Sequence, residues 1–337
     1  RYSDRNECHQ TKIRPMIRKI LILLTVMCLL SFAGCLLVPS PELPATVPPM
    51  ELADSNSQFA DVMGLQLHYK KRGNGKPIFL LLHGFGASLY TWQDIMTPLA
   101  SSGTAIAYDR PAFGLTERPL DWREWNPYSS SAQVDIALSL LDKYAINKAI
   151  IIGNSAGGTI AAQISLRAPN RVSALILVSP AFQRSRGMPD WVTPLFRLPL
   201  VRSWGLKFIR SSFQKSGSSL LEIAWHDPTK LTLQTRESYE LPLRANNWDL
   251  GLWNFILAND TPSDLAIRLT ELKQPILIVT GDDDRVIPTD DSVRLAEEIG
   301  AQLEILDSCG HVPQEECPIQ FLRSINKFIN ELEDIER

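Results

Sequence analysis

The sequence predicts an α/β protein with a mostly parallel, doubly wound sheet that is interrupted by a helical insertion. Three observations support this fold class. Short apolar runs, of the kind that parallel sheets bury on both faces, alternate with helix-like segments. Several of these runs end in glycine-containing turns. The segment 181–258 has no buried-strand pattern and holds five of the eight tryptophans.

The predicted strands and helices follow one another along the chain. Residues 59–62 and 65–71 alternate apolar and polar side chains around a Met-Gly turn, which predicts an antiparallel hairpin at a sheet edge. Further strands are predicted at 77–82, 104–108, 148–152, 172–178, 275–280 and 302–306. Helices are predicted at 132–144, 159–164, 290–299 and 318–332. We therefore expect residues 58–180 and 259–333 to form the core, with residues 181–258 as a helical lid over its carboxyl edge.

The composition is that of an ordinary globular protein. The 337 residues are 45% hydrophobic, which is enough for one substantial core and an insertion. The net charge of −3 combines +4 on residues 1–34, which hold six Lys/Arg and two Asp/Glu, with −7 on the remainder. A mildly acidic body gives no reason to expect nucleic acid as a partner.

The first 38 residues have the features of an export signal. An apolar run at 20–32 follows a basic segment. It ends in FAGC at 32–35, which resembles the lipobox of bacterial lipoproteins and implies lipidation of Cys35. The alternative is an uncleaved anchor, because residues 20–38 are uncharged and long enough to span a bilayer. Either reading predicts a membrane partner at the N-terminus and a catalytic domain on the periplasmic or extracellular side.

A proline-rich linker is predicted between this segment and the core. Five prolines lie between positions 39 and 49, and the segment has no apolar periodicity. Such sequences favour extended polyproline geometry. We expect residues 39–57 to act as a semi-rigid spacer.

Two of the five cysteines lie in the globular part. Cys309 and Cys317 are eight positions apart, in a compartment that the export signal predicts to be oxidising. The spacing allows a disulfide or two free thiols, and it fits no metal-ligand pattern. We expect neither a metal nor a cofactor.

The segment GNSAGG at 153–158 carries the strongest chemical signal. It follows the apolar run 149–152 and precedes a helix-like segment of small and apolar residues. In such a strand–turn–helix, Gly-x-Ser-x-Gly forms a nucleophile elbow: the tight turn lifts the serine hydroxyl above the sheet edge, and the glycines allow strand and helix to approach. Ser155 is the candidate nucleophile.

Other polar residues follow the ends of other predicted strands. HGFG at 83–86 comes directly after the strand 77–82, where a loop either binds a developing oxyanion through its N–H groups or is only a tight turn. The run Asp282-Asp283-Asp284 follows the strand 275–280, and His311 follows the strand 302–306. The carboxyl ends of parallel strands share one edge, so these groups should meet there.

Five motifs in this order resemble those of the α/β-hydrolases, over residues 58–333. The motifs are HGFG at 83–86, DRPAFG at 109–114, GNSAGG at 153–158, GDDDRVIP at 281–288 and GHVP at 310–313. One departure is Ala112, which stands at the first glycine of the usual D-x-x-G-x-G.

The resemblance implies a Ser–acid–His triad. Ser155 matches the nucleophile and His311 the general base. The family's acid stands three residues after the glycine that ends its strand, which selects Asp284, with Asp282 and Asp283 as neighbouring alternatives. The backbone N–H groups of Phe85 and Ala156 match the oxyanion-hole donors. Three other histidines, His68, His83 and His226, are poorer base candidates.

The function implied is a serine hydrolase that cleaves a carboxylic ester through an acyl-enzyme. The elbow and HGFGAS motifs also resemble those of hydrolases that split carbon–carbon bonds in ring-cleavage products, and a non-catalytic binding protein on the same fold is a third reading. Serine at the elbow argues against haloalkane dehalogenases and epoxide hydrolases, which use aspartate there. The tryptophan-rich insertion predicts a small-molecule substrate with an apolar or aromatic group.

Overall fold

The computed structural model describes residues 46–182, 193–196, 198–258, 262 and 264–336. All of them belong to one compact unit. The predicted export signal, Cys35 and the first part of the proline-rich segment therefore lie outside the described residues. Among the described helices, none is both long and apolar enough to cross a bilayer.

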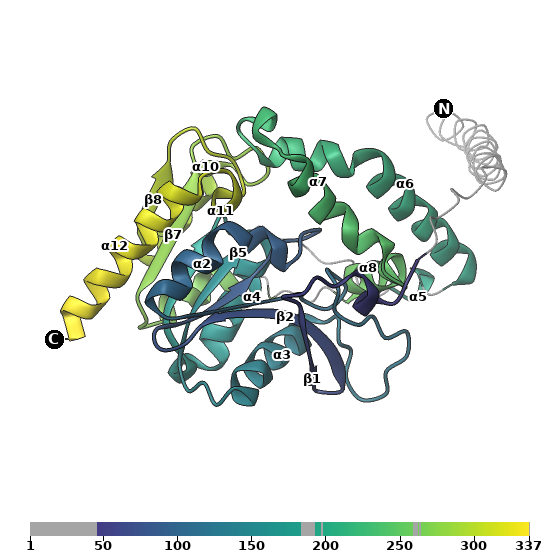
Figure 1. Cartoon of the computed structure of the whole chain (residues 1–337), viewed down its shortest axis with the longest axis horizontal. Helices are drawn as coiled ribbons and strands as arrows, with labels where there is room; N and C mark the ends of the chain where they lie inside the picture. The colour runs from purple at the N-terminus through teal and green to yellow at the C-terminus, as the bar shows by residue number, and fades with distance from the viewer. Residues whose placement is uncertain (1–45, 183–192, 197, 259–261, 263, 337) are drawn as a thin grey trace, which may run out of the picture. The chain divides into compact units, whose positions relative to one another are not determined.

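Eight strands form one sheet (Figure 1). They are β1 (Gln58–Val62), β2 (Leu65–Gly73), β3 (Ile78–Leu82), β4 (Thr104–Tyr108), β5 (Ala149–Asn154), β6 (Val172–Val178), β7 (Ile276–Gly281) and β8 (Gln302–Leu306). Their spatial order is β1-β2-β4-β3-β5-β6-β7-β8. The hairpin β1–β2 and the pair β2–β4 are antiparallel, and every other pair is parallel. The predicted α/β class with a mostly parallel sheet is confirmed.

Alternate residues of the inner strands, β3 to β7, face two separate cores. Leu80 and Leu82 of β3 pack in one cluster, and Phe79 and Leu81 pack in the other. Because side chains along a strand point to opposite faces in turn, a solid apolar run satisfies both faces at once. The sheet is therefore covered on both sides, and its polar chemistry is confined to the strand ends.

Helices cover the two faces of the sheet. On one face lie α3 (Ser130–Lys143), α4 (Ala156–Arg167), α9 (Leu265–Arg268) and α10 (Thr289–Ile299). On the other face lie α2 (Gln93–Ser102) and α12 (Pro318–Glu336). Helix α2 was not predicted, because Pro98 inside it lacks the N–H of a helix interior and is a typical sign of a helix end. Its buried residues Ile95, Met96 and Leu99 hold it on the sheet despite the proline.

The insertion between β6 and β7 is helical in its described part. It consists of α5 (Thr193–Phe196), α6 (Pro199–Ala224), α7 (Leu233–Glu240) and α8 (Trp248–Leu257), which gather on one side of the sheet (Figure 1). Leu221 and Trp225 pack against Val312, which follows the end of β8. Ile209 and Trp253 pack against Phe113, which follows β4. The insertion thus contacts the loops at the carboxyl ends of the strands.

The described end of the predicted linker packs on the folded unit instead of standing free. Val47 forms a parallel bridge with Ala245, through its N–H to the oxygen of Arg244 at 3.0 Å and its oxygen to the N–H of Asn246 at 2.9 Å. A short 3₁₀ helix (Pro49–Leu52) follows. A free spacer is therefore restricted to residues before Val47.

Candidate active site

Ser155 stands at a strained turn between β5 and α4. Its φ of 51° and ψ of −120° are unusual for a residue with a side chain and cost of order 1–3 kcal/mol. A Cβ on Gly153 would lie 2.5 Å from the oxygen of Gly157, and a Cβ on Gly157 would lie 2.2 Å from the oxygen of Leu82. The glycines are thus required by the close contact of strand and helix, as expected of an elbow.

The acid and base meet at the ends of β7 and β8. His311 Nδ1 lies 2.8 Å from Oδ2 of Asp284, and both residues are buried. The other oxygen of Asp284 accepts hydrogen bonds from the N–H groups of Val286 at 2.9 Å and Ile287 at 2.8 Å. The carboxylate is therefore fixed by its own loop and holds the imidazole through Nδ1. Nε2 is the nitrogen that remains to exchange a proton.

The two neighbouring aspartates have other partners. Asp283 bonds His226 Nδ1 at 2.8 Å and pairs with Arg285, whose hydrogen bond is the main cause that lowers the pKa of this carboxyl. Asp282 accepts the N–H of Cys309 at 3.1 Å. The structure thus places only Asp284 of this run against His311, and it places His226 on a different acid.

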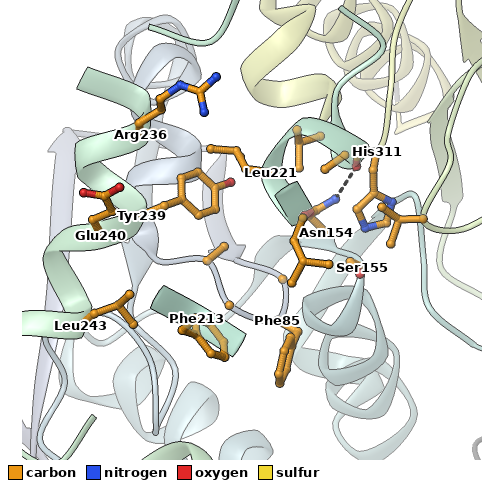
Figure 2. Close-up of a pocket in the computed structure, with 17 residues that line it drawn as sticks. Phe85, Asn154, Ser155, Phe213, Leu221, Arg236, Tyr239, Glu240, Leu243 and His311 are labelled. Carbon is orange, nitrogen blue, oxygen red and sulfur yellow. Dashed lines mark hydrogen bonds between the residues drawn. The ribbon is translucent and has the colours of Figure 1, made fainter. Parts of the chain in front are cut away.

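Sequence reasoning gave no role to Asn154, the residue before the candidate nucleophile. Its buried Nδ2 donates to the oxygen of His311 at 3.1 Å (Figure 2). It also donates to the oxygen of Val178 at 3.2 Å. It therefore ties the elbow to the loop of the base. Its place inside GNSAGG was the one available signal.

A cavity of about 270 Å³ contains this site. Ser155 and His311 both line it, although no hydrogen bond joins them in the described part of the chain. Catalytic hydrogen bonds are often long before substrate binds. The apolar lining consists of Phe85, Ala87, Phe213, Leu220, Leu221, Ala224, Leu243, Val286 and Val312. Figure 2 shows Arg236, Tyr239 and Glu240 on the opposite wall from Ser155 and His311.

The candidate oxyanion donors lie beside the elbow. A Cβ on Gly84 would lie 3.3 Å from Cβ of Ser155, so the HGFG loop that carries Phe85 closely approaches the serine. Ala156 is the first residue of α4, and the first N–H groups of a helix have no partner within it. The HGFG loop and the start of α4 thus both lie beside Ser155.

His83 is a structural member of this loop. Its Nδ1–H donates to the oxygen of Gly84 at 2.8 Å, and its Nε2 accepts the N–H of Arg110 at 3.0 Å. Burial lowers the pKa of the imidazole to about 3, so it stays neutral. His83 therefore holds the glycine turn and offers no base to the cavity.

No described tryptophan lines the main cavity. Trp191 lies outside the described residues. The ring of Trp253 covers Gly205, where a Cβ would lie 1.9 Å from the indole. Trp225 is buried against Val312, and Trp248 lines a smaller neighbouring cavity. Leucine and phenylalanine side chains line the main cavity instead, while these tryptophans attach the insertion to the core.

A second Ser–His–Asp arrangement lies away from the cavity. Oγ of Ser57 is 2.8 Å from Nε2 of His68, and Nδ1 of His68 is 2.6 Å from Oδ2 of Asp109. The Ser57 hydroxyl donates to Asp54, however, and Asp109 also accepts the N–H of Leu115 at 2.6 Å. This set stabilises the DRPAFG loop and does not present a nucleophile.

Known proteins resemble this chain over its globular part. A family model described as the alpha/beta hydrolase fold matches residues 77–318. A 2-hydroxymuconate semialdehyde hydrolase of Pseudomonas putida is 30% identical over 281 residues, which are 80% of this chain and 92% of the relative. The enzyme of the same name from Pseudomonas sp. (strain CF600) is 28% identical over equal shares.

A solved structure gives the same picture. The meta-cleavage product hydrolase from Pseudomonas fluorescens IP01 superposes with a TM-score of 0.62 at 27% identity, covering 81% of this chain and 97% of that one. The residues matched by the family model include the parallel strands of the sheet and the elbow. The chain is therefore a hydrolase that belongs to the alpha/beta hydrolase fold family.

Proposed function

We propose that Ser155, His311 and Asp284 form the catalytic triad of this hydrolase. The observation that carries the proposal is the shared cavity: Ser155 and His311 line one space, with Asp284 bonded to the far side of the imidazole. His311 would take the serine proton as Oγ attacks a carbonyl carbon, and Asp284 would hold the imidazole in the required tautomer.

The N–H groups of Phe85 and Ala156 would receive the oxyanion that this attack creates. Loss of one such donor typically costs about 10²- to 10³-fold in rate. His311 would then return the proton to the leaving group and activate the water that releases the acyl product.

For the substrate, we infer a keto acid of the ring-cleavage type, cleaved at a carbon–carbon bond beside its ketone. The relatives above are named as hydrolases of 2-hydroxymuconate semialdehyde or of a meta-cleavage product. Such a substrate carries a carboxylate, and Arg236 is the one permanently charged cation among the described residues that line the cavity. Its Nη1 bonds Glu222 at 3.2 Å, which leaves the Nε–Nη2 edge for a two-pronged contact with a carboxylate.

A carboxylic ester is the second candidate, because the mouth of the cavity is apolar. Phe85, Leu220 and Val286 all line the cavity and keep 48%, 57% and 42% of their surfaces exposed. An uncharged ester with an apolar chain fits such an entrance. The predicted export also favours it, since ring-cleavage pathways normally operate in the cytoplasm.

Arg236 separates the two candidates. We would assay a 2-hydroxy-6-oxo-dienoate and p-nitrophenyl esters of increasing chain length with the wild type, Ser155→Ala and Arg236→Gln. Carbon–carbon cleavage predicts turnover of the dienoate, with KM raised at least tenfold in Arg236→Gln while ester turnover is unchanged. Ester turnover alone, indifferent to Arg236, would support the second candidate.

Covalent labelling tests the triad itself. A fluorophosphonate should modify the wild type and not Ser155→Ala. Turnover and labelling that persist in Ser155→Ala would overturn the proposed nucleophile, and the absence of both from the intact protein would favour the binding-protein reading.

We further propose that the chain is exported and tethered to a membrane through its N-terminus. The support is the basic and apolar order of residues 1–32 and the FAGC segment at 32–35. Mass spectrometry of the mature N-terminus should find a lipid-modified Cys35. An N-terminus that begins beyond Cys35 without lipid would refute the lipoprotein form.

A further inference from the structure

Glu316 uses its carboxylate to hold two separate pieces of backbone. It ends α11 (Pro313–Glu316), and only 8% of its surface is exposed. Oε2 accepts the N–H of Gly310 at 2.7 Å and of His226 at 2.9 Å, and Oε1 accepts the N–H of Asp227 at 2.8 Å. In the described part of the chain Glu316 forms no ion pair, so its charge is balanced by these N–H dipoles.

The first of these segments carries the candidate base. Gly310 immediately precedes His311, and a Cβ on Gly310 would lie 2.4 Å from the oxygen of Ala224. The N–H of His311 donates to that same oxygen at 2.7 Å. The backbone around His311 is therefore packed directly on the end of α6, and the Glu316 carboxylate joins the same two segments from the other side.

A covalent link lies next to this hydrogen bond. Cys309 and Cys317 form a disulfide. This bond and the hydrogen bond from the N–H of Gly310 to Glu316 are adjacent links that close the same short loop. His311 stands at the closed end of this loop, one residue beyond Gly310.

We propose that Glu316 is a positioning residue for His311: its carboxylate fixes the base's loop against residues 224–227 of the insertion and so keeps the imidazole on Asp284. This inference rests on the proposed triad. It assigns Glu316 no contact with the substrate, since the side chain acts only through backbone N–H groups. A displacement of the imidazole by about 1 Å is enough to cost on the order of 10²-fold in rate.

The test compares Glu316→Ala and Glu316→Gln with a control that loses stability elsewhere. Gln keeps the shape and one acceptor oxygen, so it should lose less than Ala. The control is Ile136→Val in α3, fully buried on the sheet and remote from the loop. Each variant is assayed for kcat and KM on the substrate that the wild type turns over.

Proton NMR supplies a readout that a general loss of structure would not mimic. The hydrogen-bonded Nδ1–H of His311 should give a low-field resonance, assigned by its absence from His311→Ala. The buried pair of His68 and Asp109, whose Nδ1 and Oδ2 are 2.6 Å apart, should give a second such resonance in the same molecule, away from Glu316. It serves as the internal reference.

We expect Glu316→Ala to lower kcat at least tenfold with KM within threefold, and to weaken the His311 resonance while that of His68 persists. Glu316→Gln should lie between Ala and wild type, and Ile136→Val should keep kcat within twofold. A wild-type kcat, or an unchanged His311 resonance in both Glu316 variants, would overturn the positioning role. Failure of the triad itself would appear separately, as activity that survives Ser155→Ala.

Discussion

Tyr239 of the insertion donates a hydrogen bond of 2.5 Å from its hydroxyl to Oε1 of Glu315 in the core. Thr91 donates to the same oxygen. Burial, which is the largest effect, raises the pKa of the Glu315 carboxyl from 4.5 to about 7. Tyr239 also lines the cavity, so this contact fastens one cavity wall to the core.

The burial of Glu315, which raises the pKa of its carboxyl, predicts a pH dependence of stability. A carboxyl whose pKa is raised on folding binds its proton more tightly in the native state, so its contribution is complete below about pH 4.5 and is lost as the pH rises through 7. Glu315→Gln resembles the protonated form and should remove this decline. Thermal melts from pH 4.5 to 8 should show the variant gaining on the wild type as the pH rises. The exposed control Glu297→Gln should follow the wild type, and an equal decline in Glu315→Gln would contradict the assignment.

Adjacent aspartates provide a matched pair of variants. Asp284→Asn should leave the fold intact and lower kcat by roughly 10³- to 10⁴-fold, because the amide favours the wrong imidazole tautomer. Asp283→Asn alters only the pair with His226 and Arg285, so kcat should stay within a few-fold of wild type. Steady-state kinetics on one substrate decide this. Equal losses in the two variants would mean that the acid is not resolved to Asp284.

Ala112 predicts a gain in stability on replacement by glycine. Its φ of 79° is in the left-handed region, which costs a residue with a Cβ on the order of 1–3 kcal/mol. Ala112→Gly relieves this strain but loses a buried methyl group, at about 0.8 kcal/mol. The net should be stabilising by roughly 0.2–2 kcal/mol in urea unfolding.

Ala107, in the middle of buried β4, is the matched control for this change. Ala107→Gly loses a methyl group without relief of strain, and glycine in a strand interior is unfavourable. It should therefore destabilise by more than about 1 kcal/mol. The same sign for both variants would argue against strain at Ala112.

The disulfide should contribute measurably to stability. Closing the loop from Cys309 to Cys317 removes chain entropy from the unfolded state, worth roughly 2–3 kcal/mol for a loop of this size. The double variant Cys309→Ala/Cys317→Ala should lose this amount in denaturant unfolding. Reductant should lower the stability of the wild type and not of the double variant. A wild type that is indifferent to reductant would instead indicate free thiols.

The strands were predictable because their signal is local. Each inner parallel strand is a short apolar run, and burial of both sheet faces is the cause of that pattern. The elbow was predictable for a similar reason, since contact between Gly153 and Gly157 excludes larger residues from fixed positions in one short segment.

Other parts of the site depend on contacts between remote segments. The turn after β7 directs Asp284, rather than Asp283, toward His311. Amino-acid composition does not show the geometry of this turn. Asn154 and Glu316 bind backbone groups that are remote from them in the sequence. Every residue has such backbone groups, so the residue types at those positions do not indicate the contacts. The contacts of the individual tryptophans could not be predicted, because aromatic content alone does not distinguish a cavity wall from a helix contact.

The hydrogen bond from the N–H of His311 to the oxygen of Ala224 makes the core depend on the insertion. The base follows a core strand, but the acceptor of its backbone N–H belongs to the insertion. A truncated chain that joins β6 directly to β7 would keep every triad residue and still lack one support of the base. Core and insertion are consequently not interchangeable modules. A different insertion grafted onto this sheet would have to replace the backbone contact that supports the histidine, as well as the wall of the pocket.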